Sequence, residues 1–301
     1  DDTFNRLILL AGLTAREVTV LRAYARYLRQ TGITYSQGYI ADTMNRYPGI
    51  AADIFRLFVA RLDPALAEKT RERKCRAIAA AIEEALAAVP SLDDDRILRR
   101  YVNAVQATLR TNYFQQGADG NPPAVLAFKL DPHALDGLPE PRPYREIFVY
   151  GTEVEGVHLR FGPIARGGLR WSDRAQDYRT EVLGLVKAQQ VKNAVIVPVG
   201  AKGGFYPKQL PAGGSRDEIF NAGKDAYKTF IRTLLSVTDN IVGPDVVPPP
   251  DTLRIDGDDP YFVVAADKGT ATFSDTANGL AQEAGFWLDD AFASGGSAGY
   301  D

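Results

Sequence analysis

The chain has 301 residues, 45% of them apolar, which is enough for one large hydrophobic core or two smaller ones. Its formal net charge of −3 argues against a nucleic-acid partner, and no apolar run reaches the roughly 18 residues that cross a membrane. The single cysteine, Cys75, excludes an internal disulfide and a four-cysteine metal site and favours a cytoplasmic location. Because the chain starts at Asp1 without methionine or a signal peptide, we expect it to be part of a longer protein.

The first part of the chain, residues 1–116, is predicted to be a helical region. Thr14 and Glu17 have the spacing of a capping box ahead of an apolar stripe that extends to Gly32. Tyrosines and arginines in this region are interpreted as core edge and solvated face, so we expect no chemistry here. Further helices are expected at 36–47, 50–62, 64–89 and 96–113.

Glycines and prolines are dense at 117–144, which predicts a loop-rich junction and a domain boundary. The rest of the chain, 145–301, is predicted to be an α/β domain with a mixed sheet. It opens with two strand-like runs, 146–152 and 156–161, which predict a hairpin.

The two histidines have no pattern that suggests catalysis or metal binding. His133 lies in the junction without a second ligand at a suitable spacing, so a surface position is expected. His158 alternates with apolar neighbours and belongs to the other face of its strand, without a serine or cysteine pattern beside it. No metal site is predicted from either residue.

A cluster of cations and glycines begins at Arg166. Two glycines, Gly167 and Gly168, allow a turn or a close backbone approach to a ligand, and Arg170 follows them after one residue. Guanidinium groups on both sides of such a turn favour binding of an anion.

Two lysines follow at the ends of predicted elements. A helix at 178–193 carries Lys192 in its last turn, a short strand is expected at 194–199, and Lys202 stands among glycines in a turn beyond it. The helix and strand would bring both lysines to one place, where clustered cations bind carboxylates and favour proton transfer. The alternative is that Lys192 complements the helix dipole and Lys202 sits in a flexible turn.

A long helix is expected at 216–239, and the proline-rich segment 244–250 must be extended. Four aspartates follow it, which are interpreted as turn formers in preference to ligands of a hard cation. A strand at 261–266 then ends at Asp267, where ligands usually bind in α/β sheets. The four aspartates are Asp251, Asp256, Asp258 and Asp259.

Several strings resemble a known family. GGLR at 167–170 and PVGAKGG at 198–204 are similar to the substrate site of the glutamate dehydrogenases. The longer strings RGGLRWSDR, AADKGTATFSD and FWLDDAFASGG resemble the large-subunit bacterial NAD-dependent type, over about 145–301. They begin at Arg166, Ala265 and Phe286.

The resemblance implies a role for each site residue. Arg166 would bind the side-chain carboxylate of the substrate next to Gly167 and Gly168, and Lys192 its α-carboxylate. Lys202 would be catalytic and Asp267 would transfer a proton, with Asp251 as a weaker alternative. The sequence departs from the small hexameric enzymes in having arginine at 166 and one glycine fewer before Lys202.

The implied reaction is oxidative deamination of L-glutamate to 2-oxoglutarate and ammonia, with NAD as the hydride acceptor. No Gly-x-Gly-x-x-Gly string follows a predicted strand, so NAD is expected to bind mainly to a domain absent from this chain. We expect neither a nucleic-acid nor a membrane partner, and the full-length protein is expected to be a homo-oligomer. A non-catalytic regulatory or interaction domain that binds dicarboxylates is the alternative.

Overall fold

A computed structural model describes residues 2–192 and 200–298, except for the side chains of 189–192. The chain divides into two compact units, Asp1–Thr108 with His133–Pro139 and Leu109–Pro132 with Glu140–Asp301. The first unit is helical, and the second contains a mixed sheet with helices on both faces. The predicted α/β class, a helical region followed by a mixed sheet, is confirmed.

The helices of the first unit begin at side-chain caps. The Thr14 hydroxyl accepts a hydrogen bond from the Glu17 amide, and the Glu17 carboxylate accepts one from the Thr14 amide, which closes the predicted capping box. Ser36 and Ser91 cap two further helices with their hydroxyls. The elements are η1 Thr3–Arg6, α1 Leu7–Leu10, α2 Ala15–Gln30, α3 Gln37–Arg46, α4 Pro48–Leu62, α5 Glu68–Leu86 and α6 Leu92–Gln106.

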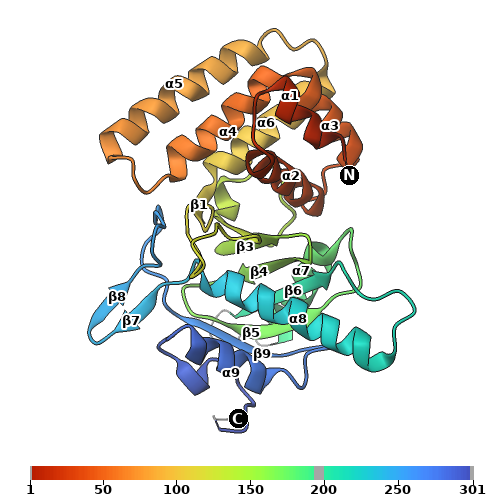
Figure 1. The fold of residues 1–301 in the computed structure, drawn as a ribbon, viewed down its shortest axis with the longest axis vertical. Coiled ribbons are helices and arrows are strands. Elements are labelled where there is room, and N and C mark those ends of the chain that lie inside the picture. The colour runs from red at the N-terminus through yellow and green to blue at the C-terminus, as the bar shows by residue number, and fades with distance from the viewer. Residues whose placement is uncertain (1, 193–199, 299–301) are drawn as a thin grey trace. The chain divides into compact units, whose positions relative to one another are not determined.

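The second unit is built on a sheet that, within the described residues, has seven strands in the order β1-β2-β3-β4-β6-β5-β9 (Figure 1). Strands β2, β3, β4 and β6 pair antiparallel, which confirms the predicted hairpin, whereas β5 pairs in parallel with β6 and β9. The strands are β1 Thr108–Thr111, β2 Leu126–Leu130, β3 Arg145–Tyr150, β4 Val154–Arg160, β5 Ala165–Trp171, β6 Ala201–Pro207 and β9 Phe262–Ala266. The other elements are η2 Pro132–Ala134, α7 Tyr178–Lys192, α8 Arg216–Leu235, β7 Asn240–Val242, β8 Asp245–Val247, α9 Ser274–Glu283 and η3 Asp289–Ala291.

Helices cover both faces of this sheet. Phe205 of β6 packs against Tyr227 and Phe230 of α8, with ring centroids 5.7 Å apart in both pairs, and Figure 1 shows α8 lying across the sheet. The neighbouring Gly204 points the other way, where Val182 of α7 lies against it. Because side chains alternate along a strand, even-numbered residues of β6 face α7 and odd-numbered residues face α8.

Four segments that were predicted as helix, junction or turn are strands. Residues 108–111 form β1 instead of the end of a helix, and 126–130 form β2 inside the expected junction, because both runs are fully buried against the sheet. The glycine-containing segments 166–171 and 201–204 lie in β5 and β6 instead of turns. Their glycines admit close approach of neighbouring elements. The strand predicted at 194–199 lies outside the described residues.

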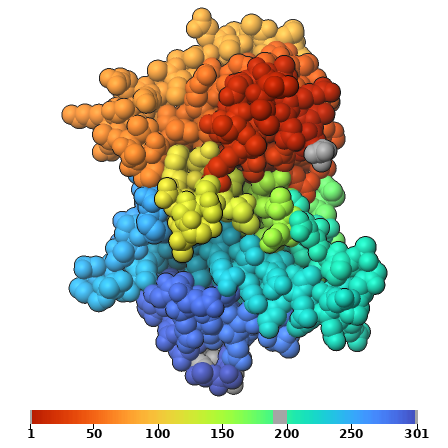
Figure 2. All heavy atoms as spheres, in the orientation of Figure 1, coloured from red at the N-terminus to blue at the C-terminus, as the bar shows by residue number. Residues whose placement is uncertain are grey.

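A two-stranded hairpin of β7 and β8 extends from the second unit. It turns at Gly243, which has a φ of 59°, and it stands out from the body of its unit in the space-filling view (Figure 2). The side chains of Val242 and Val247 are exposed along it. The extended backbone predicted for 244–250 is confirmed for its central part by β8.

Candidate active site

The candidate site is centred on Asp267, immediately after β9. The Lys202 ammonium donates a hydrogen bond to Asp267 Oδ2 at 3.1 Å. On the other oxygen, Oδ1, the Arg170 guanidinium donates two hydrogen bonds, at 3.1 and 3.3 Å, and the Lys268 amide donates a third at 2.7 Å. One carboxylate is therefore held between two cations, each from a different strand.

These contacts outweigh the effect of burial on Asp267. Burial by itself raises the pKa of this carboxyl, but the Lys268 amide, the Lys202 ammonium and the Arg170 guanidinium together hold its pKa below the ordinary value. Asp267 is therefore a carboxylate at neutral pH, with Oδ2 turned toward Lys202. Such a group can accept a proton in a reaction.

The backbone that carries Asp267 is bonded to the end of β5. The Thr270 hydroxyl accepts a hydrogen bond from the Asp267 amide at 3.1 Å and donates one to the Leu169 carbonyl at 2.7 Å. The Trp171 amide donates to the Lys268 carbonyl at 3.0 Å. The turn after β9 is thus fixed by a buried threonine and by the backbone of the neighbouring strand.

Two glycines give the site its tight packing. A Cβ atom on Gly167 would lie 1.5 Å from the carbonyl oxygen of Ala201, so no other residue lets β5 approach β6 this closely. A Cβ atom on Gly168 would lie 3.1 Å from Asp267 Oδ2 and 3.0 Å from the Ala266 carbonyl. The bare backbone at Gly168 leaves the space in which the Asp267 carboxylate lies.

The register of the sheet places Lys202 beside these glycines. Leu169 pairs with Gly203, so the preceding residues, Gly168 and Lys202, lie side by side and face α7. Arg166 is exposed in β5, two residues before Gly168 and on the same face of the strand. Arg166, Gly168 and Lys202 therefore share one face of the sheet.

Two predicted site residues remain, Lys192 and Asp251. Lys192 is the last residue of α7, and its side chain lies outside the described residues. Asp251 is exposed in the turn after the prolines, with a φ of 48°. The structure brings Asp267 to Lys202, which favours Asp267 over Asp251 as the carboxylate of the site.

Two charged residues of this site, Arg170 beside Asp267 and Glu181 beside Arg170, received no role from the sequence. Arg170 stands in the GGLR string, and Glu181 of α7 lies 3.9 Å from its guanidinium. The alternation of side chains along β5 was the available signal, because it places Arg170 on the same face as Arg166 and Gly168. That signal was hidden by the interpretation of this segment as a turn.

Matches to family models cover most of the chain. Residues 81–301 match the bacterial NAD-glutamate dehydrogenase catalytic domain. The chain belongs to that family. Residues 1–64 match a second model of the same enzymes, glutamate dehydrogenase helical motif 3.

Curated bacterial relatives of this glutamate dehydrogenase domain are all longer proteins. The NAD-specific glutamate dehydrogenase of Pseudomonas aeruginosa is 58% identical over the whole of this chain, which covers 19% of that protein. The Mycobacterium tuberculosis protein of the same name is 57% identical over the whole of this chain, which covers 19% of that protein. A third, from Halomonas elongata, is 58% identical over the whole chain, which covers 18% of its length. The chain thus spans about a fifth of the length of these relatives.

The described residues of this glutamate dehydrogenase domain do not fit a dinucleotide site. The segment between β5 and α7, residues 172–177, contains no glycine, and no Gly-x-Gly-x-x-Gly turn joins a described strand to a described helix. Such a turn is needed for a pyrophosphate to reach a helix N-terminus.

A buried ionic network occupies another part of the same unit. Arg110 of β1 donates hydrogen bonds to both oxygens of Asp239, at 2.8 and 3.0 Å, and to Asp256 at 2.7 Å. Lys129 contacts Asp256 and Asp259. Burial by itself raises the pKa of Asp239, but Arg110 holds it below its ordinary value. These aspartates, two of which were predicted as turn formers, are engaged by protein cations.

His158 lies next to this network and on the opposite face of the sheet from Lys202. The Arg160 guanidinium donates a hydrogen bond to His158 Nδ1 at 3.2 Å, and the His158 ring meets Phe262 edge to face at 4.9 Å. Complete burial, together with the positive charge of Arg160, holds the pKa of His158 well below its ordinary value. His158 is therefore a neutral core residue.

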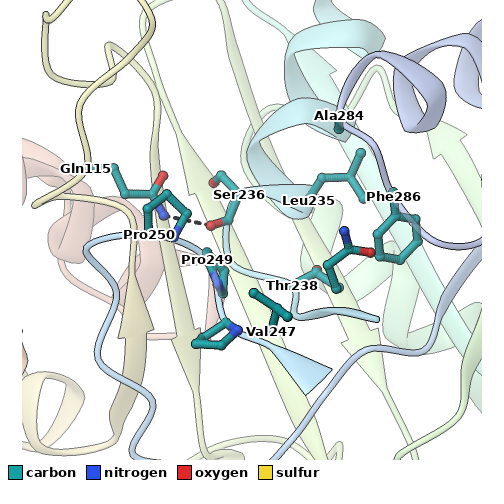
Figure 3. A pocket seen from close by; sticks show the side chains of 11 residues that line it. Gln115, Leu235, Ser236, Thr238, Val247, Pro249, Pro250, Ala284 and Phe286 are labelled. Atoms are coloured by element: carbon teal, nitrogen blue, oxygen red, sulfur yellow. Dashed lines mark hydrogen bonds between the residues drawn. The ribbon is translucent and has the colours of Figure 1, made fainter. Parts of the chain in front are cut away.

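A separate cavity of about 290 Å³ lies beside the proline-rich segment (Figure 3). Leu235, Val247, Pro249 and Phe286 contribute apolar walls. A polar group at its edge is used within the chain, because the Gln115 amide donates to the Ser236 carbonyl at 2.7 Å. The Ser236, Thr238 and Asn240 side chains likewise donate to backbone carbonyls, so the polar groups that line the cavity are engaged within the chain and do not converge on a ligand.

Neither metal binding nor membrane insertion has support in the described ranges. Across residues 2–192 and 200–298, no three histidine, cysteine, aspartate or glutamate side chains are grouped so that they could hold a metal ion. None of the helices in these ranges is both long enough and apolar enough to cross a membrane.

Proposed function

We propose that this chain supplies the substrate-binding and proton-transfer residues of an NAD-dependent glutamate dehydrogenase. The full-length protein would convert L-glutamate, water and NAD⁺ to 2-oxoglutarate, ammonium, NADH and a proton. The single observation that carries the proposal is the contact of 3.1 Å between Lys202 Nζ and Asp267 Oδ2, on the sheet face that also presents Arg166. The catalytic-domain family match supports it, and it does not favour the non-catalytic alternative.

In this proposal each residue acts at a stated part of glutamate. Arg166 binds the side-chain carboxylate, and Lys192 binds the α-carboxylate, so that the substrate is fixed at both ends. The backbone of Gly167 and Gly168 lets the substrate approach the sheet closely.

The reaction also needs two proton movements at the α-carbon and its nitrogen. The Asp267 carboxylate accepts the proton that the substrate amino group releases as the Cα–N bond becomes an imine. Water then adds to this carbon and its two protons pass to the departing nitrogen, which leaves as ammonium, while the Lys202 ammonium stabilises the oxygen that develops into the carbonyl. Hydride acceptance by NAD belongs to parts of the protein beyond the described residues.

Further parts of the proposal concern the whole protein. NAD would be bound mainly by a domain outside this chain, and the full-length protein would be a cytoplasmic homo-oligomer. L-glutamate and 2-oxoglutarate would be its small-molecule partners. The name shared by the bacterial relatives, NAD-specific glutamate dehydrogenase, supports the assignment of NAD and of glutamate.

Steady-state kinetics of the full-length protein test the proposal. Lys202→Met and Asp267→Asn should each lower kcat by at least about a hundredfold and change KM for glutamate much less, because both groups act on proton movement and developing charge. Arg232→Gln is the matched control, since Arg232 is exposed on α8 and pairs with the exposed Glu283. Normal kcat in both site variants would refute the catalytic assignment and support a regulatory domain.

A further inference from the structure

Arg170 has no part in the function proposed above. Its side chain nevertheless donates two hydrogen bonds to Asp267, whereas that of Lys202 donates one. The Nε and Nη2 atoms of Arg170 both donate to Oδ1 of Asp267, at 3.3 and 3.1 Å. Lys202 holds the opposite oxygen, Oδ2. Arg170 thus fixes the rotation of the carboxylate from one side and leaves Oδ2 directed to Lys202.

The other side of Arg170 is held by helix α7. Glu181 Oε1 lies 3.9 Å from Arg170 Nη1, and Glu181 Oε2 lies 3.6 Å from the guanidinium of Arg174. The Arg170 and Glu181 side chains are only 21% and 14% exposed, so their charges are only partly screened by solvent. Arg170 is therefore oriented by carboxylates at both ends, Glu181 on α7 and Asp267 after β9.

The charges around Asp267 come from three elements of the described structure. Arg170 of β5 and Lys202 of β6 contribute positive charge. Glu181 of α7 contributes negative charge at a greater distance, through Arg170, and the Lys268 amide contributes a hydrogen bond. Arg170 supplies both charge and geometry, because two donors of its planar fork meet one oxygen.

We propose that Arg170 is a positioning residue for the reaction, which holds Oδ1 of Asp267 so that Oδ2 stays turned toward Lys202 and accepts the substrate proton there. This inference rests on the proposed function, since it requires Asp267 to act in proton transfer. Arg170 itself does not touch the reacting atoms; it acts through Asp267. Its hydrogen bonds to Oδ1 also contribute to the lowered pKa of Asp267.

The test compares Arg170→Gln and Arg170→Lys in the full-length protein. Both should lower kcat by up to about a hundredfold, because the fork that orients the carboxylate is lost and a small misplacement is costly. KM for glutamate should change little. In Arg170→Gln the acidic limb of the profile of kcat/KM against pH should move to higher pH, because a positive charge that lowers the pKa of Asp267 has been removed. Arg170→Lys keeps the charge and should move that limb less.

A second variant keeps the inference testable if Arg170→Gln does not fold. Glu181→Gln removes the negative charge behind Arg170 and leaves the fork in place. The uncompensated Arg170 should then lower the pKa of Asp267 further, so the acidic limb should move to lower pH. A shift in the opposite direction for Glu181→Gln would overturn the inference.

The outcomes separate this inference from the proposed function. Unchanged turnover in Asp267→Asn would refute the proposed role of that carboxylate. If Asp267→Asn is inactive while Arg170→Gln keeps normal kcat and an unshifted pH profile, only the positioning role of Arg170 fails. A large rise in KM with normal kcat in Arg170→Gln would also overturn it, because Arg170 would then bind substrate.

Discussion

Replacement of Asp239 by alanine should destabilise the α/β unit strongly. The Asp239 side chain is fully buried and accepts hydrogen bonds from Arg110 at 2.8 and 3.0 Å, from Arg254 at 3.1 Å and from the Asp259 amide at 2.7 Å. Among the described residues, Asp239→Ala leaves the buried Arg110 with one carboxylate partner, Asp256. Breaking a buried pair on one side costs about 3–5 kcal/mol, and the retained Asp256 places the expected loss near the lower value.

A loss of about 3 kcal/mol corresponds to a drop in Tm of about 10 °C for a unit of this size. Urea denaturation followed by near-ultraviolet circular dichroism measures the change in unfolding free energy. The matched control is Arg232→Gln, which breaks a pair whose side chains are 56% and 66% exposed and should change stability by less than about 0.5 kcal/mol. If the unfolding free energy of Asp239→Ala differs from that of the wild type as little as the control does, the ionic network does not stabilise the unit.

Two further predictions concern packing and pH. Gly167→Ala should separate β5 from β6, because its Cβ would lie 1.5 Å from the Ala201 carbonyl oxygen. Turnover of the full-length protein should therefore fall. The control Gly184→Ala, whose Cβ would have nothing within 4 Å, should keep normal turnover. The unfolding free energy should decrease as pH falls below about 6.5, because the unfolded chain then protonates His158 whereas the folded chain, in which the pKa of His158 is lowered, excludes that proton. Denaturation at a series of pH values should show a shallower decrease in His158→Gln, and an equal slope in both proteins would contradict this assignment.

Short-range patterns allowed part of this fold to be predicted. The capping box of Thr14 and Glu17 and the hairpin of β3 and β4 depend on residues near one another in sequence, and both were recognised. Strand β2 was missed, since both of its faces are buried and its residues do not alternate between apolar and polar. Glycines in β5 were interpreted as turn residues, because glycine is expected both where the chain reverses and where two backbones approach closely.

Contacts between distant residues could not be predicted from periodicity. Lys202 and Asp267 were chosen through a family resemblance, and their contact joins residues 65 positions apart. Arg110 and Asp256 lie 146 positions apart, and nothing in either local segment indicates the other. Their pairing follows from strand order and register, which only the folded sheet determines.

The attachment of the Asp267 turn to β5 also determines how the site opens. The amides of Asp267 and Trp171 are bonded to Thr270 Oγ1 and to the Lys268 carbonyl, so they can exchange hydrogen with solvent only when this edge of the sheet separates. Amide exchange at both residues should therefore be as slow as in the neighbouring strands, in contrast to an ordinary surface loop. The Asp267 carboxylate is therefore expected to belong to the same cooperative folding unit as the sheet. If it accepts the substrate proton as proposed, thermal loss of activity in the full-length protein should coincide with melting of that unit.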